Sequence, residues 1–301
     1  MIKRYFVLLL CLSLVTVTQA KITKSFKTLI ITGQNNHNWE ASSPILKQIL
    51  DETGLFLTDI VKTPPGKADM NSFRPDFSKY KLVVLDYNGD SWPEETKAAF
   101  LNFVKNGGGV VIYHAADNSF PEWKEFNQII GLGGWGNRTE KDGPYVYFKD
   151  GKRVVDPSPG KTGSHGKRVP FKITDQVVNH PITKGLPKQW MHAADELYSN
   201  LRGPAKNMEI LATAYSDPAT GGSGKEEPML MTIKYGKGRI FHTTLGHAGN
   251  DEKVFPSLEC AGFIVTFQRG AEWAASGKVT QAVPEGFPDD KKVVIWPGYK
   301  K

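Results

Sequence analysis

The stretch at residues 107–120, GGGVVIYHAADNSF, most constrains what this chain can fold into. Its apolar run from Val110 to Tyr113 is β-branched and aromatic and too short for a helix, so it predicts a buried parallel strand. Two alanines follow His114, and a helical pattern begins near Pro121, so the chain must turn sharply where the strand ends. In open α/β sheets ligands bind at that edge. His114 is therefore a candidate site residue, with simple packing at a strand end as the alternative.

The first twenty residues have the pattern of a secretory signal peptide. Lys3 and Arg4 precede an apolar run over residues 6–17, which ends in Thr-Gln-Ala before a polar segment begins. A charged start, an apolar core and a small residue at the end are typical of such peptides, and the run is too short for an ordinary transmembrane helix. We therefore expect cleavage after Ala20, export to the periplasm or the medium, and no membrane span in the mature chain.

Composition favours one large globular domain. The chain has 40% hydrophobic residues, enough for a sizeable core. Cys260 is the only cysteine beyond the signal peptide, so an intrachain disulfide is excluded and a buried, inert thiol is expected. The formal net charge is +7, but the lysines are scattered among acidic residues without a basic block. We therefore expect no nucleic acid partner, and a homo-oligomer remains open.

The first half of the chain alternates predicted strands with predicted helices. Strands are expected at 27–32, 55–61, 81–87 and 110–113, and helices at 40–53 and 93–106. This alternation predicts an α/β fold, a doubly wound, mainly parallel sheet with helices on both faces. Because right-handed crossovers place the carboxyl ends of parallel strands on one edge, the polar residues that follow three of these strands should lie together. They are Asn35, His37 and Trp39, then Asp86, Asn88 and Asp90, then His114 and Asp117.

The middle of the chain changes character. Residues 131–166 are dense in Gly, Pro and Lys and carry one hairpin strand near 145–148, so we interpret them as a loop-rich insertion. His165 lies within it and is expected either in solvent or on a loop folded over the sheet edge. Later elements are predicted as strands at 168–173, 209–214, 229–235 and 239–243 and a helix at 256–271. His247 follows the last of these strands and is a second histidine at a strand end.

Three motifs carry a family resemblance. They are GGGVVIYHAADNSF, HPITKGLPKQW followed by DELY, and YGKGRIFHTTLGHA. In this order they resemble the ThuA-like (trehalose utilisation) family, whose members are similar to the class I glutamine amidotransferase-like superfamily. The resemblance covers residues 26–273 and implies a flavodoxin-like sheet. The chain would then consist of a signal peptide (1–20), a ThuA-like domain (21–273) and a C-terminal extension (274–301).

The same resemblance argues against amidotransferase chemistry. In that superfamily the turn after the equivalent strand carries a cysteine nucleophile, and a histidine after a late hairpin completes the site. Here those positions hold His114 and His247, and Cys260, on a predicted helix that faces the core, does not replace the nucleophile. A thiolate mechanism is therefore not expected.

Histidines and carboxylates remain as the chemical groups of the site. Neutral imidazoles with a carboxylate form a common first-row metal site. We expect His114, Glu196 and His247 to bind a divalent metal, with zinc as the first choice. The reserve ligands are His37 and His165. The alternative is that His114 and His247, together with Asp117, act as acid and base without a metal. Because export is expected, no nucleotide cofactor is expected.

The resemblance also implies a carbohydrate substrate, since ThuA-like proteins are associated with the use of trehalose and related disaccharides, including through keto-sugar derivatives. Tryptophans near the predicted edge loops would suit stacking on a sugar ring, although a single tryptophan more often anchors a loop. These tryptophans are Trp39, Trp92, Trp123 and Trp135. The residues expected to contact the substrate are His37, Trp39, Asn88, Asp195 and Tyr198.

Three functions are compatible with these features. The first is an exported enzyme that acts on a glycoside or an oxidised sugar. The second is a carbohydrate-binding protein without turnover, and the third is an accessory subunit of a sugar oxidoreductase. Turnover of a saccharide would distinguish the first from the other two.

Overall fold

The computed structural model describes residues 25–296, so the predicted signal peptide lies outside the described residues. The strands are β1 (Phe26–Thr32), β2 (Phe56–Lys62), β3 (Leu82–Leu85), β4 (Gly109–Tyr113), β5 (Tyr145–Lys149), β6 (Lys152–Asp156), β7 (Val169–Asp175), β8 (Gln189–Asp195), β9 (Met208–Tyr215), β10 (Glu226–Tyr235) and β11 (Gly238–Thr243). The helices are α1 (Trp39–Asp51), α2 (Glu94–Lys105), α3 (Lys124–Ile130), α4 (Pro256–Glu259) and α5 (Ala261–Ser276). Within this part of the chain no helix is both long and apolar enough to cross a membrane.

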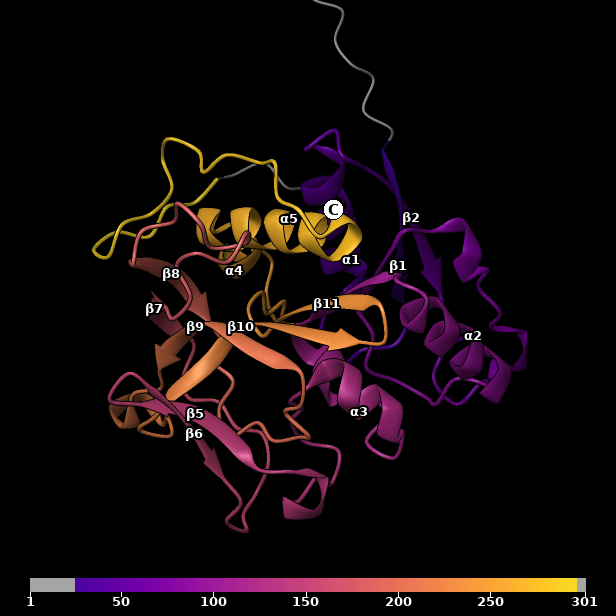
Figure 1. Cartoon of the computed structure of the whole chain (residues 1–301), viewed down its shortest axis with the longest axis horizontal. Coiled ribbons are helices and arrows are strands. Elements are labelled where there is room, and N and C mark those ends of the chain that lie inside the picture. The colour runs from indigo at the N-terminus through magenta and orange to yellow at the C-terminus, as the bar shows by residue number, and fades with distance from the viewer. Residues whose placement is uncertain (1–24, 297–301) are drawn as a thin grey trace, which may run out of the picture.

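One sheet runs through the described part of the chain, in the strand order β2-β1-β3-β4-β11-β10-β9-β7-β8 (Figure 1). Its first five strands pair in parallel. They alternate their apolar side chains between two cores: Ile30, Val84 and Val111 face the core that contains α1 and α5. Ile31 and Ile112 face the other core, which contains side chains of α2 and α3. Side chains of helices therefore lie in the cores on both sides of this half of the sheet, in a mixed α/β fold.

The other half of the sheet is antiparallel, so the expectation of a mainly parallel sheet holds for five strands only. β10 pairs antiparallel with β11 and with β9, and β7 pairs antiparallel with β9 and β8. The physical reason is visible at β10 and β11, which are joined by Gly236 and Lys237 alone. A two-residue connection cannot hold a crossover helix and forces the chain to return antiparallel, and Gly236 takes the required positive φ of 58°.

The segment 131–166 contains long loops and also adds to the sheet. β5 and β6 form an antiparallel hairpin, and Phe148 of β5 pairs with Glu226 of β10. The sequence predicts one strand of this hairpin and treats the segment as separate from the sheet. The structure instead connects the hairpin to the antiparallel half, at the lower left of Figure 1.

The predicted helix at 256–271 is interrupted at Cys260. This residue has extended ψ of 124° and separates α4 from α5, and it forms an isolated bridge with Ile295 of the C-terminal tail. Its thiol is free and buried, as expected. The tail beyond α5 is held by backbone hydrogen bonds, from Ala261 N to Val294 O (2.9 Å) and from Met191 N to Asp289 O (2.7 Å). It forms the extended strap drawn in yellow beside α5 in Figure 1.

The start of β4 offers a test of how tightly α5 supports the strand that carries His114. A Cβ atom added at Gly109 would lie 2.5 Å from Ala274 O, which is backbone of α5 and cannot rotate away. We expect Gly109→Ala to lower the free energy of unfolding by about 1–3 kcal/mol, measured by urea denaturation. Gly66→Ala is the control, because its Cβ would lie 3.8 Å from Gln34, an ordinary contact. Equal stability of the two variants would contradict this packing.

Candidate metal centre

The sharp turn at the end of β4 places His114 at the carboxyl edge of the parallel strands. His114 has a φ of +44° and begins a short 3-10 helix, His114–Asn118. Non-glycine residues in the left-handed region are uncommon, and such strain is concentrated at functional sites. The side chain is 1% exposed, and its Nδ1 lies 2.6 Å from Thr244 O, in the segment after β11. The strand thus delivers an imidazole in a fixed orientation to the edge where ligands bind in open sheets.

Four histidines surround the carboxylate of Glu196. Glu196 Oε2 lies 3.6 Å from His37 Nε2 and 3.7 Å from His114 Nε2. Its other oxygen, Oε1, lies 3.2 Å from His247 Nε2 and 3.6 Å from His165 Nε2. These residues follow β1, β4, β8 and β11 or belong to the 131–166 segment, so long-range folding alone brings them together.

The ring orientations of three of these histidines suit metal binding. In each, Nδ1 faces a hydrogen-bond acceptor, which favours a proton on Nδ1 and a lone pair on Nε2. The acceptors are Thr244 O for His114 (2.6 Å), Gly166 O for His165 (2.9 Å) and Asn35 Oδ1 for His37 (3.4 Å). For His247 the tautomer is not fixed in this way, because Glu252 Oε2 and Arg168 Nη1 both lie 3.5 Å from its Nδ1. The Nε2 lone pairs therefore point at an anionic oxygen, an arrangement that a cation or an added proton stabilises.

The compact part of the cluster consists of His37, His114 and Glu196, whose ligand atoms all lie within 4.8 Å of one another. Donor atoms bound to one first-row ion lie about 3.4 Å apart when the bonds are about 2.1 Å long, so a small contraction would complete the set. Nitrogen with carboxylate oxygen is also the donor chemistry that zinc accepts. The residues present therefore fit a divalent ion. The geometry favours His37 over His247 in the ligand set, because His247 lies on the other carboxylate oxygen.

The electrostatics of the cluster keep its groups in complementary states. Burial would raise the pKa of Glu196, but the interactions with His114 and His37 hold it well below the usual range of a carboxyl group. Burial lowers the pKa of His37. Burial and the charge of His114 lower the pKa of His247 to about 4. Burial opposes protonation of His114 too, but Glu196 and Asp195 raise its pKa above the ordinary value. At neutral pH the rings of His37 and His247 are thus neutral beside the ionised carboxylate of Glu196. A neutral imidazole and an ionised carboxylate are the states that bind metals.

Comparison with known proteins decides the family of this chain. The sequence model of the ThuA family, described as trehalose utilisation, matches residues 27–274. The chain belongs to the ThuA family. A comparison with curated proteins finds no match.

Two solved structures are similar to this ThuA protein. A ThuA-like protein from Parabacteroides merdae ATCC 43184 is 56% identical with a TM-score of 0.89, and the match covers 92% of this chain and 100% of that one. A ThuA-like protein from Bacteroides uniformis ATCC 8492 is 20% identical with a TM-score of 0.53, over 87% of this chain and 96% of that one. The second similarity shows the fold alone. The resemblance drawn from the sequence motifs is confirmed, and the fold is consistent with the class I glutamine amidotransferase-like superfamily.

Asp195 is a buried carboxylate that holds the backbone of the site together, and its predicted role in substrate binding stays a prediction. It is 1% exposed. Its Oδ1 accepts hydrogen bonds from Glu196 N (2.7 Å) and His247 N (3.0 Å), and its Oδ2 accepts from Gly246 N (2.7 Å) and contacts His192 Nε2 at 2.7 Å. Asp195 therefore fixes the end of β8 to the loop after β11. The sequence could not distinguish the role of Asp195 from that of Glu196, because these adjacent acidic residues differ only in where their side chains point in the fold.

Asp117, the third predicted catalytic group, lies in the core beside His242 and not in the histidine cluster around Glu196. Asp117 is fully buried, and its Oδ2 lies 3.4 Å from Nε2 of His242, another fully buried side chain. Direct contact with a substrate is therefore blocked by the surrounding core. Asp86 is the carboxylate that sequence reasoning undervalued, because it accepts hydrogen bonds from Asn35, the neighbour of His37 in the cluster, and from Ser42 and Ser43 of α1.

The remaining predicted contacts divide between the site and the core. Tyr198 belongs to the site, since its hydroxyl lies within hydrogen-bond distance of His114 Nε2, at 3.0 Å. Trp135 lies beside it, with a ring-centroid distance of 4.8 Å. Trp92 and Trp123 are 2% and 8% exposed and pack in the core, so the expectation that they stack on a sugar is wrong.

Two further predicted contacts make other interactions at the edge. The Trp39 ring lies 5.0 Å from Lys62 Nζ, a cation–π contact at the start of α1. Asn88 donates to Asn36 Oδ1 at 2.8 Å, which links the loops after β3 and β1. Both are half-buried at the edge of the parallel strands, and their predicted role in substrate binding stays a prediction.

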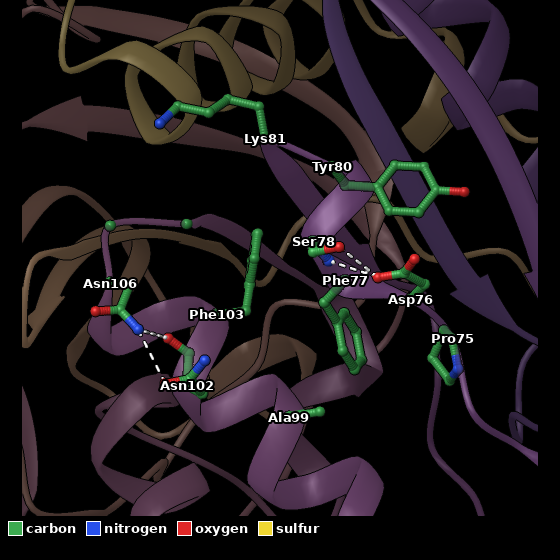
Figure 2. Close-up of a pocket in the computed structure, with 12 residues that line it drawn as sticks. Pro75, Asp76, Phe77, Ser78, Tyr80, Lys81, Ala99, Asn102, Phe103 and Asn106 are labelled. Carbon is green, nitrogen blue, oxygen red and sulfur yellow. Dashed lines mark hydrogen bonds between the residues drawn. The ribbon is translucent and has the colours of Figure 1, made fainter.

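A separate pocket of about 440 Å³ lies at the opposite end of the parallel strands (Figure 2). It is lined by Phe77 and Tyr80 before β3, by Phe103 and Asn106 of the α2 region, and by the backbone at Gly108 before β4. Its described lining contains none of the predicted site residues. It is therefore distinct from the histidine cluster.

The clamp formed by Asp195 can be tested without any ligand. We expect Asp195→Asn to speed amide hydrogen exchange at Gly246 and His247 by at least about tenfold, because a buried charged acceptor is replaced by a group that partly repels these donors. Glu272→Gln is the matched control, since Glu272 is a buried carboxylate that accepts backbone hydrogen bonds from the tail at Thr280 and Gln281. Unchanged exchange at Gly246 and His247 in Asp195→Asn would show that other contacts hold the loop.

Proposed function

We propose that this ThuA protein is an exported, zinc-dependent enzyme that acts on a glycoside or a keto-sugar derivative. The convergence of four histidines on the ionised carboxylate of Glu196 carries this proposal. The family description, trehalose utilisation, supports a carbohydrate substrate. Export is proposed from the pattern of residues 1–20, which lie outside the described residues. Because an exported protein has no access to cytosolic nucleotides, no nucleotide cofactor is proposed.

His37, His114 and Glu196 would hold the ion. When bound, a divalent ion would supply Lewis-acid polarisation of a substrate oxygen. His247 would act as the general base, because its Nε2 faces the centre of the cluster and its lowered pKa keeps it neutral. The carboxylates of Glu196 and Glu252, at 3.2 Å and 3.5 Å from its two nitrogens, would stabilise the imidazolium that forms.

A keto sugar suits this arrangement. Its carbonyl oxygen is a ligand for a cation, and the C–H group beside the carbonyl is acidic enough for an imidazole base. His114 would be oriented by Thr244 O at its Nδ1, and the hydroxyl of Tyr198, 3.0 Å from its Nε2, would have to leave this nitrogen when it binds the ion. His165, at 37% side-chain exposure, would face the incoming substrate.

Zinc binding and turnover separate the roles of the histidines. We expect His114→Ala and Glu196→Gln to lower zinc affinity by about 100-fold or more, because each removes a ligand. We expect His247→Ala to retain zinc and to lower turnover by about 100-fold or more, because it removes the base. The measurements are zinc titration by calorimetry and a turnover screen on glycosides and their 3-keto forms, with unfolding curves for each variant.

His180→Gln is the control for these variants, because His180 lies outside the cluster and contacts Trp273 instead. Normal turnover in His114→Ala, or a wild-type protein that binds no divalent ion, would refute the proposed enzyme. Saccharide binding without turnover would instead support the carbohydrate-binding function.

The pH dependence of zinc binding follows from His114. Its pKa is raised above the ordinary value of 6.5, so below that raised pKa it holds a proton that zinc must displace. We therefore expect zinc affinity to rise with pH until His114 is deprotonated, by about tenfold per pH unit below its pKa. Calorimetry at pH 6 and pH 8, in two buffers of different ionisation enthalpy, measures both the affinity and the proton released. Equal affinity at the two pH values would contradict displacement of this proton.

A further inference from the structure

Trp135 lies at the border of the histidine cluster. Its ring centroid is 4.8 Å from that of Tyr198 and 6.4 Å from that of His165. The Tyr198 hydroxyl in turn lies 3.0 Å from His114 Nε2, and His165 Nε2 lies 3.6 Å from Glu196 Oε1. Trp135 is half-buried, unlike Trp92 and Trp123 in the core, so its ring is available for contact with a ligand.

The loop that carries Trp135 is rigid and strained. Trp135 has a φ of +47°, an outlier for a bulky side chain. The next turn is held by Arg138, which is 4% exposed. Its guanidinium donates to Asn118 O, Ser119 O, Gly134 O and Asn127 Oδ1. Because Asn118 ends the 3-10 helix that starts at His114, Arg138 ties the tryptophan loop directly to the turn that carries the candidate metal ligand.

Gly163 supports the ring. A Cβ atom at Gly163 would lie 2.6 Å from Trp135 Cδ2, so the indole lies against a bare stretch of backbone. Gly163 also has a positive φ of 76°, and its N–H donates to Asn200 O. The indole thus packs partly against the core beside α2 and α3, and specific contacts with Gly163 and Tyr198 fix its position at the border of the site. Strain and close packing of this kind are features of functional sites.

A pocket of about 740 Å³ adjoins Trp135. Besides the indole it is lined by the polar side chains of Asn137, Thr139 and Lys161. Glycine backbone at 136, 160 and 163 forms much of the remaining wall. An aromatic surface with amide, hydroxyl and ammonium groups suits a neutral, polyhydroxylated ring, whose C–H face packs on the indole while its hydroxyls exchange hydrogen bonds.

We propose that Trp135 and this pocket form a second sugar-ring subsite beside the histidine cluster. One ring of the substrate lies at the cluster, and the next packs against Trp135. The family description already suggests a disaccharide, and the new assignment is that Trp135 is the residue that favours saccharides of two or more rings over a single ring. This inference rests on the proposed function for the ring at the cluster, whereas the subsite itself needs no metal.

The test compares saccharides of one and two rings. Methyl glucoside, trehalose, maltose and cellobiose are titrated by calorimetry into the zinc-loaded and the metal-free protein, and saturation-transfer NMR maps the contacting ring. We expect Trp135→Ala to weaken binding of the preferred disaccharide by about tenfold, the upper range for one aromatic stacking contact, and to leave methyl glucoside within about twofold. Trp135→Phe should recover part of the loss. Phe103→Ala, which removes an aromatic ring from the pocket in Figure 2, is the control and should bind like the wild type.

The outcomes distinguish this subsite from the enzyme proposal. Disaccharide binding that depends on Trp135 in the metal-free protein supports the subsite even if zinc and turnover are absent. Disaccharide affinity that is no greater than that of methyl glucoside, or that survives in a folded Trp135→Ala variant, overturns the subsite even if zinc-dependent turnover is found. Unfolding curves of Trp135→Ala and Trp135→Phe separate loss of binding from loss of structure.

Discussion

The contacts of one buried carboxylate join the two halves of this molecule. Asp195 ends β8, the outermost antiparallel strand, yet it accepts hydrogen bonds from Gly246 and His247, which follow the parallel strand β11. The same side chain holds the backbone of Glu196. Buried Asp195 thus fixes the backbone positions of Glu196 and His247, whose side chains meet in the cluster. The strained turn at His114 completes the same edge from the parallel side.

Sequence reasoning found the parts of the site that local patterns encode. The strand before His114 and the hairpin before His247 have short, strongly apolar signatures, so both histidines could be placed at strand ends. For His165 the sequence left two positions open, solvent or the sheet edge, because its contact with Glu196 depends on where a glycine-rich loop folds back over the sheet. The hairpin of β10 and β11 was predicted from its short turn, but the antiparallel pairing of β7, β8 and β9 was missed, because the apolar runs of parallel and antiparallel strands look alike in sequence. The sequence also did not distinguish Trp92, a core residue, from the half-buried Trp135, because the burial of a loop tryptophan depends on how the loop folds.

The turn at His114 bears on the amidotransferase chemistry that the family resemblance argues against. The strained strand end remains, but it carries an imidazole in place of the thiol expected from the superfamily. The one cysteine of the described chain is buried beside His192, and it cannot reach the edge. In this protein the turn directs a nitrogen donor, His114 Nε2, toward Glu196 and the neighbouring histidine rings.

The C-terminal strap has a consequence for association between molecules. β8 lies at one end of the strand order, and an exposed edge strand offers unpaired backbone groups to other chains. The strap occupies part of this edge, where Met191 N donates to Asp289 O. It is anchored again where Ile295 meets the break between α4 and α5. A strand-paired assembly would therefore have to form at another edge of the sheet, such as β2, where Leu57 is 57% exposed.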